Sequence, residues 1–195
     1  MVPPYDARTA LLVVDVQNDF ADPTGSLAVP GAAEIFAPIN AEIERALAAG
    51  ALTVYTQDWH PPTTPHFRKD GGLWPVHCVA GTWGAELHPD LAVEGPVVKK
   101  GVGGEDGYSG FSVRDPQSGE VDATQLEGML RTGGVSRVVV VGLATDYCVV
   151  ETALDGRRLG FDVEVIAAAT RAVDMRPGDG ERALERMREA GATIA

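Results

Sequence analysis

Cys148 has the setting that best suits a side chain for covalent chemistry. It follows a run of four valines, Val138–Val141, which is typical of a strand buried on both faces, and it precedes a stretch with helical periodicity. A thiol at the start of a helix lies near unpaired N–H groups and the positive end of the helix dipole, which lower its pKa. The same N–H groups can stabilise an oxyanion. We therefore expect a nucleophilic thiolate; the alternative is a small thiol packed under the helix.

Two other residues have the chemistry that a cysteine nucleophile needs. Asp15 ends an apolar segment, Ala10–Val16, where an unpaired carboxylate is costly to bury, although it could instead cap the following loop. Lys100 ends the short segment Val97–Lys100 and is one of only three lysines, so it could serve chemistry that arginine cannot, or be a solvated strand-end lysine. We expect Asp15 to act as the base and Lys100 to stabilise the thiolate by its charge. Tyr147, not a histidine, precedes the cysteine, which disfavours a histidine-dependent cysteine protease.

A second group of side chains suits a divalent metal ion. Asp58 and His60 stand at the end of an apolar segment, and His66 and His77 follow in the same stretch of chain. Oxygen and imidazole ligands fit Zn, Fe or Mn, and an ion there could bind a ring nitrogen or polarise a water molecule. The alternative is that these histidines pack against the prolines and tryptophans of a loop, which is the interpretation we adopt for His88.

Three aromatic residues, Phe20, Trp74 and Tyr108, are candidates for the walls of a pocket. Taken singly, each could equally belong to the core. Together with the thiol and the metal ligands, they describe a pocket for a small, planar, nitrogen-containing amide.

The elements that must position these residues alternate between strands and helices. We expect strands at Ala10–Val16, Ala51–Gln57, Val97–Lys100, Val138–Val141 and Phe161–Ala168, and helices at about Ile35–Leu47, Val121–Arg131, Cys148–Leu159 and Asp179–Ala190. This alternation predicts a three-layer α/β/α fold with a mainly parallel central sheet. Ligands bind such sheets beyond the carboxyl ends of the strands, where the candidate site residues fall.

Local signals place the boundaries of these elements. Gly50 is expected to end the first long helix, and Gly142 to end the valine strand. Thr145 and Asp146 are candidate N-caps for the helix that carries the cysteine. The irregular stretch at about 58–95 is rich in Pro, Gly, His and Trp, and a long insert of this kind is more often functional than filler.

Length and composition limit the class of protein. The 195 residues predict a single domain, 1–195, with a metal-binding loop insert at about 58–95. A net charge of −12 argues against nucleic acid or an anionic membrane as a partner. Two cysteines make no disulfide framework, and we find neither a signal peptide nor an apolar run of membrane-spanning length, so a reducing cytoplasm is expected. Monomer and homo-oligomer remain equally open.

With these residues assembled, the chain resembles the nicotinamidases (pyrazinamidases) of the isochorismatase-like cysteine hydrolase superfamily. The resemblance rests on six motifs in matching order and spacing. These are Val13–Phe20, Asp58–His60, Trp74–Cys78, Lys100–Gly101, Tyr108–Phe111 and Gly142–Cys148. It implies an isochorismatase-like (Rossmann-like) fold and a reaction that converts nicotinamide to nicotinate and ammonia through a cysteine thioester, with pyrazinamide as a further substrate and a place in NAD salvage.

The resemblance also implies roles for individual residues. The triad is Asp15, Lys100 and Cys148; the oxyanion hole is Ala144 and Cys148, with a cis peptide between Leu143 and Ala144. The ligands of one divalent metal ion (Zn, Fe or Mn) are Asp58, His60 and His77, with His66 as a possible fourth. The nicotinamide ring lies among Phe20, Trp74 and Tyr108, its nitrogen on the metal. Tyr147 stands where some relatives have histidine, and we expect this departure to alter the edge of the pocket without abolishing activity.

Four other functions are less consistent with these residues than nicotinamide hydrolysis. Relatives that act on carbamoyl or ureido amides share the triad but generally lack the Asp/His cluster, and isochorismatases proper do not use the cysteine. A catalytically silent metal- or ligand-binding protein would have no need of an intact triad. A thiol redox sensor using Cys78 and Cys148 lacks any Cys-x-x-Cys spacing.

Overall fold

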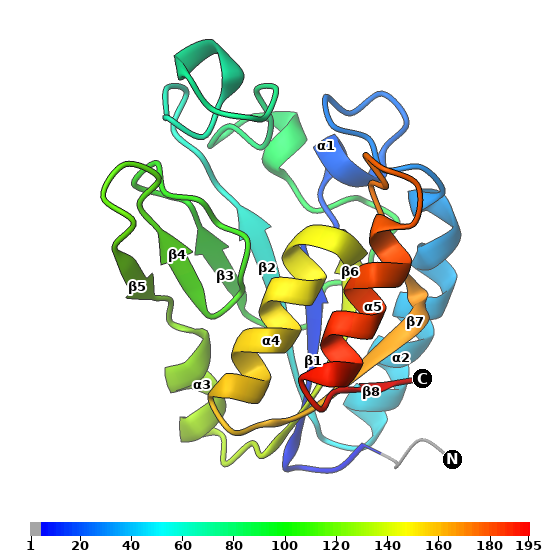
Figure 1. Ribbon diagram of the computed structural model, residues 1–195. Coiled ribbons are helices and arrows are strands. Elements are labelled where there is room, and N and C mark those ends of the chain that lie inside the picture. The colour runs from blue at the N-terminus through cyan, green and yellow to red at the C-terminus, as the bar shows by residue number, and fades with distance from the viewer. Residues whose placement is uncertain (1–4) are drawn as a thin grey trace.

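A central sheet of six parallel strands organises the protein, and its order is β3-β2-β1-β6-β7-β8. The computed structural model describes residues 5–195 (Figure 1). The strands are β1 (Thr9–Val14), β2 (Leu52–Asp58), β3 (Val97–Lys100), β6 (Arg137–Leu143), β7 (Asp162–Arg171) and β8 (Thr193–Ile194). The five expected strands are confirmed within a few residues; the short β8 was not expected.

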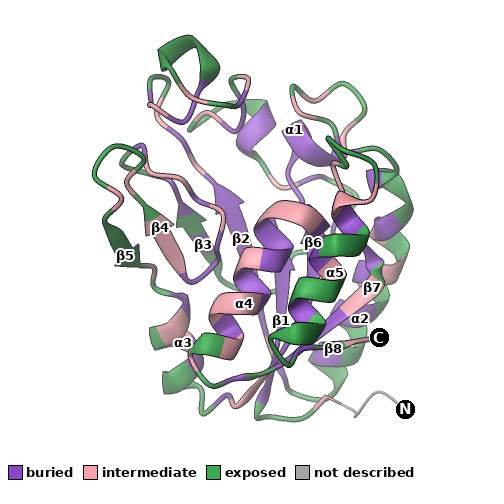
Figure 2. Ribbon diagram, in the orientation of Figure 1, coloured by how far each residue is buried: buried purple, intermediate pink, exposed green. Residues whose placement is uncertain are grey.

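Helices cover both faces of the sheet (Figures 1 and 2). One face packs against α3 (Leu126–Thr132), α4 (Val150–Arg158) and α5 (Asp179–Glu189). The other face packs against α2 (Phe36–Ala48) and the short helix α1 (Asn18–Ala21). The predicted three-layer α/β/α architecture is therefore confirmed.

Burial on both faces explains the continuous apolar runs in the sequence. In β1, Leu12 and Val14 belong to the core under α4, whereas Leu11 and Val13 belong to the core under α2, and none of them is exposed. A strand at the centre of such a sheet needs apolar residues at every position rather than at alternate ones. Each central strand is thereby fixed in place up to its carboxyl end.

The helix expected at Val121–Arg131 begins later than predicted. Val121–Ala123 forms strand β5, which pairs antiparallel with β4 (Ser112–Arg114). The side chain of Thr124 then accepts a hydrogen bond from the Leu126 N–H, and α3 starts there. Val121 is largely exposed, so it adds nothing to the apolar face of the helix.

Two expectations around the valine strand were wrong. Strand β6 continues through Gly142 to Leu143 instead of ending at the glycine. Gly142 has a φ of +112°, and a Cβ there would lie 2.1 Å from the carbonyl oxygen of Val14, so the glycine permits close approach to β1. Neither Thr145 nor Asp146 caps a helix; the Asp146 carboxylate instead accepts hydrogen bonds from the backbone N–H groups of residues 173 and 174.

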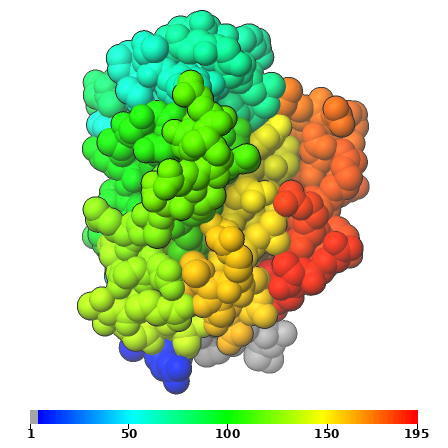
Figure 3. Space-filling view, turned by 60° about the vertical axis from the view of Figure 1, so that its left-hand side comes forward, coloured from blue at the N-terminus to red at the C-terminus, as the bar shows by residue number. Residues whose placement is uncertain are grey.

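The stretch at 58–95 is irregular, as expected, and carries only two short 3-10 turns, Arg68–Asp70 and Trp83–Ala85. It forms the upper part of the molecule in Figures 1 and 3, above the carboxyl ends of the strands. Among residues 5–195, no helix is long and apolar enough to cross a membrane. Residues 1–4 of the expected single domain lie outside the described residues.

Candidate active site

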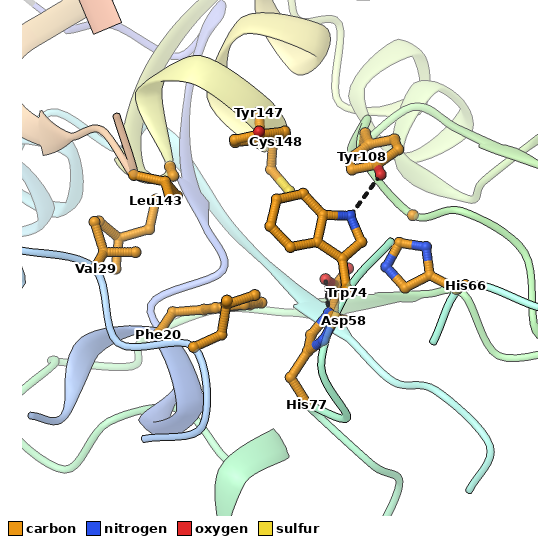
Figure 4. A pocket seen from close by; sticks show the side chains of 14 residues that line it. Phe20, Val29, Asp58, His66, Trp74, His77, Tyr108, Leu143, Tyr147 and Cys148 are labelled. Atoms are coloured by element: carbon orange, nitrogen blue, oxygen red, sulfur yellow. Dashed lines mark hydrogen bonds and ion pairs between the residues drawn. The ribbon is translucent and has the colours of Figure 1, made fainter. Parts of the chain in front are cut away.

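Cys148 lies where β6 passes into α4, within a single π-helical turn at Thr145–Val149. Its side chain faces the pocket of Figure 4, and the residue is only 7% exposed. The predicted position between a buried strand and a helix is confirmed. The expected lowering of the thiol pKa is not, because burial raises the pKa of Cys148 well above its usual value and the charge of Lys100 only partly opposes this.

Lys100 connects the other charged groups at the carboxyl edge of the sheet. Its fully buried Nζ lies 2.7 Å from the Asp15 carboxylate, donates to Asp58 Oδ1 and the Gly107 carbonyl, and lies 3.7 Å from the Cys148 sulfur. Burial alone would lower the pKa of Lys100, but the two carboxylates raise it well above its usual value. Lys100 therefore carries its positive charge beside the thiol.

Asp15 lies immediately beyond β1, in a left-handed backbone conformation with φ of 50°. The Thr56 hydroxyl donates to its Oδ1 at 2.6 Å, and a carboxylate oxygen comes within 4.8 Å of the Cys148 sulfur. Burial raises the pKa of Asp15, against the opposing charge of Lys100. A carboxylate with a raised pKa is a stronger base than an exposed one, which suits it to receive the thiol proton.

The three expected metal-ligand histidines come together across the same edge. Ring nitrogens of His60, His66 and His77 all lie within 4.8 Å of one another. The Asp58 Oδ2 is 3.7 Å from His60 Nε2 and 3.9 Å from His77 Nε2. Burial would raise the pKa of Asp58, but Lys100 and the histidines lower it below its usual value, so the carboxylate is ionised.

The hydrogen bonds of these histidines fit a cation at the centre of the cluster. His66 Nδ1 lies 2.6 Å from Asp106 Oδ1, and His77 Nδ1 lies 2.7 Å from the Pro75 carbonyl, so both rings place Nδ1 on an outward acceptor. Burial lowers the pKa of His77 to about 4, which keeps that ring neutral. His60 is fully buried, and neither of its ring nitrogens has a hydrogen-bond partner. A metal ion bound to Nε2 would supply a partner for one of the two nitrogens.

Asp106 is a residue of this site that the sequence reasoning missed. It lies on the loop after β3, 40 residues from His66, and cross-strand hydrogen bonds with Arg114 fix its backbone. No sequence spacing links the two residues. Only a general rule could have suggested a partner for His66, namely that a metal-binding histidine usually donates its second ring N–H to a carboxylate or carbonyl.

All three expected aromatic residues line the pocket above Cys148. The indole N–H of Trp74 donates to the Tyr108 hydroxyl at 2.7 Å, and the Phe20 ring lies 5.5 Å from the His77 ring (Figure 4). The sequence did not identify the aliphatic residues that complete the wall, which are Leu27, Val29, Leu143 and Val173.

Ala144 and Cys148, the expected oxyanion residues, both line this pocket, and the peptide between Leu143 and Ala144 is cis. Cys78, the other cysteine, is buried and makes no disulfide. Its backbone N–H donates to the Asp19 carboxylate at 2.7 Å, and burial raises the pKa of its thiol. Cys78 thus lies in the packed wall behind His77 and does not line the pocket.

Comparison with known proteins places this site in a family. The isochorismatase domain model matches residues 9–195. The nicotinamidase of Escherichia coli is 36% identical over 95% of this chain and 93% of its own. Among solved structures, the pyrazinamidase of Pyrococcus horikoshii in complex with zinc is 41% identical with a TM-score of 0.86, covering 96% of this chain and 98% of its own.

A third match bears on the ligand: PnC1 from L. infantum, in complex with nicotinate, is 34% identical with a TM-score of 0.89, covering 100% of this chain and 96% of its own. Residues 9–195, which the family model matches, include every strand of the sheet and all the candidate site residues. The chain belongs to the isochorismatase family.

Proposed function

We propose that the protein is a nicotinamidase, an amidohydrolase that converts nicotinamide to nicotinate and ammonia and also accepts pyrazinamide. The observation that carries this proposal is the position of Lys100, whose Nζ contacts Asp15, Asp58 and Cys148 at the base of an aromatic-lined pocket. The similarity to the nicotinamidase of E. coli, and to a protein solved with nicotinate, supports the choice of substrate.

Substrate binding follows from the shape of the pocket. Phe20, Trp74 and Tyr108 offer flat apolar walls for a six-membered ring, and the hydrogen bond between Trp74 and Tyr108 holds two of these walls in place. Asp58, His60, His66 and His77 would hold one divalent metal ion, which supplies a Lewis acid for the ring nitrogen. Zinc is the first ion to test, since the P. horikoshii protein was solved with it.

Asp15 and Cys148 carry the covalent chemistry. Asp15 accepts the thiol proton while the Cys148 sulfur attacks the carboxamide carbon, and Lys100 stabilises the negative charge of the pair. The backbone N–H groups of Ala144 and Cys148 hold the oxyanion. Asp15 then donates its proton to the departing ammonia, leaving a thioester.

Hydrolysis of the thioester uses the same groups a second time. Asp15, once more ionised, accepts a proton from a water molecule that attacks the thioester carbon. Asp15 returns this proton to the Cys148 sulfur as the bond between sulfur and carbon breaks, so the thiol is restored and nicotinate leaves with release of the acid's proton to solvent. Burial raises the pKa of both Asp15 and Cys148, so the proton moves between groups that are each poorly suited to holding a negative charge.

The proposal is tested by measuring ammonia release from nicotinamide, pyrazinamide and a carbamoyl amine, with elemental analysis of the same sample. We expect the two aromatic amides to be hydrolysed and about one divalent ion per chain. Preference for the carbamoyl amine would instead assign the enzyme to the carbamoyl and ureido amidohydrolases. The net charge of −12 disfavours a nucleic-acid or anionic-membrane partner. Two free cysteines fit a reducing cytoplasm, and the proposed reaction would belong to NAD salvage.

A further inference from the structure

Tyr147 lies at the edge of the pocket. It lines the inner pocket with Cys148, and it also lines two wider hollows, one bordered by α4 with strands β4 and β5 and the other by α5 with the segment that carries Met175. Among the described residues, Tyr147 is shared by all three of these spaces. The Tyr147 ring therefore forms part of the boundary between the pocket and both hollows.

Three aromatic residues that line the pocket, Trp74, Tyr108 and Tyr147, differ in how strongly their rings are held. Trp74 and Tyr108 are joined by a 2.7 Å hydrogen bond. Tyr147 packs edge-on against Trp74, with ring centroids 4.8 Å apart and an interplanar angle of 82° (Figure 4). Its hydroxyl donates to the Met175 sulfur at 3.2 Å. A thioether is a weak acceptor, and Met175 is 58% exposed, so the Tyr147 ring is the least firmly held of the three.

The backbone beneath this side chain is fixed. The Tyr147 N–H donates to the Ala144 carbonyl at 3.1 Å. The neighbouring Asp146 carboxylate accepts hydrogen bonds from the N–H groups of Val173 and Asp174, which ties the segment that carries Met175 to the same turn. Rotation of the Tyr147 side chain therefore requires the loss of one weak hydrogen bond and of two ring contacts, with Trp74 and Tyr108, and no movement of the main chain.

We propose that Tyr147, held in place by Met175, determines the size of the substrate ring. In its closed position it limits the pocket to carboxamides of a single six-membered ring and excludes fused two-ring amides such as quinoline-3-carboxamide. This inference rests on the proposed function, because it concerns which amides reach Cys148. The Met175 contact sets how often the ring is closed and therefore how strictly size is selected.

The test compares nicotinamide with quinoline-3-carboxamide in Tyr147→Ala, Tyr147→Phe and Met175→Ala. In Tyr147→Ala we expect the ratio of kcat/KM, fused amide over nicotinamide, to rise about tenfold or more, since pocket contacts discriminate on this scale. The KM for the fused amide should fall while that for nicotinamide rises, a split that general damage to the fold would not produce.

The two milder variants isolate the contact between the hydroxyl and the sulfur. Tyr147→Phe and Met175→Ala should each raise the ratio by roughly two- to fivefold, the effect of one weak hydrogen bond, and the double variant should do no more than either alone. Val121→Ala is the matched control, because Val121 lines the adjacent hollow but not the pocket, and it should leave the ratio unchanged.

A binding measurement separates this inference from the proposed function. Calorimetric titration of both amides into Cys148→Ala, with and without Tyr147→Ala, needs no turnover. Tighter binding of the fused amide in the double variant supports the inference; identical selectivity with and without the Tyr147 ring overturns it. Absence of ammonia release by the unmodified enzyme would overturn the proposed function and leave this binding result standing.

Discussion

The triad and the histidine cluster border the same pocket but are built in different ways. Asp15, Lys100 and Cys148 each lie at the carboxyl end of a sheet strand, where packing on both faces fixes the chain. The charges of this triad are balanced within the protein. The three histidines come from the irregular 58–95 stretch, and the ring of His60 has no hydrogen-bond partner at either nitrogen. The triad therefore has its charges paired by its own residues, whereas the histidine cluster is the region where we propose a bound cation.

Asp58 joins the two regions. One carboxylate oxygen accepts from Lys100, and the other lies within 4 Å of His60 and His77. Because a single side chain serves both, the regions are coupled in charge even though different parts of the chain supply them. Substitutions on either side of Asp58 should therefore separate turnover from metal binding, and the following predictions are ordered by the size of the expected effect.

Replacing the nucleophile should give the largest effect. Cys148→Ala is expected to reduce ammonia release from nicotinamide by on the order of 10⁴-fold or more, because no other group can form the thioester. Metal content and far-UV circular dichroism should match those of the unmodified protein. Cys78→Ala is the matched control and should retain turnover. Substantial ammonia release by Cys148→Ala would rule out the covalent route.

Removing the charge of the triad should affect stability as well as turnover. Lys100→Met leaves Asp15 and Asp58 buried without their cation, and we expect a loss of about 3–5 kcal/mol in the free energy of unfolding. Lys99→Met, one residue earlier, is the control, since Lys99 is exposed and lies over the Trp59 ring. Denaturant unfolding of both variants checks this, and equal stabilities would show that Lys100 is not the balancing charge.

Removing one histidine should impair metal binding by the histidine cluster and leave the triad intact. His60→Ala is expected to lose bound metal and to raise the KM for nicotinamide strongly, while the unfolding free energy of the metal-free protein changes far less than in Lys100→Met. His88→Ala is the control, because His88 stacks on Phe36 outside the cluster. Elemental analysis and steady-state kinetics measure both effects. Unchanged kinetics in a metal-depleted sample would remove the metal from the mechanism.

The same contrast explains how much could be predicted from sequence. The positions of Asp15, Lys100 and Cys148 follow from the alternation of strands and helices, since the carboxyl ends of parallel strands share one edge. The joining of His66 and His77 with His60 follows from no periodicity, because an irregular loop folds by tertiary contacts. For these residues, the resemblance to known hydrolases supplied the assignment.

The errors also have physical causes. Gly142 was expected to end a strand, whereas it allows two backbones to approach. The pKa of Cys148 was expected to be lowered by a helix N-terminus, but desolvation of the thiol outweighs the nearby positive charge. Burial of this kind depends on the fully folded protein and is not contained in the local sequence.

Asp106 allows the most specific test of the difference between the triad and the histidine cluster. Its carboxylate contacts His66 from outside the cluster and is not one of the carboxylates that pair with Lys100 in the described part of the chain. Asp106→Asn replaces the carboxylate that accepts from His66 Nδ1 with a neutral amide, which weakens the outward hydrogen bond and the basicity of Nε2. We expect metal affinity to fall about 10- to 100-fold, measured by competition with a chelator. Asp122→Asn, on the neighbouring exposed strand, should leave the affinity unchanged. If Asp106→Asn binds metal as tightly as the unmodified protein, His66 is not a ligand, and the cluster reduces to Asp58, His60 and His77.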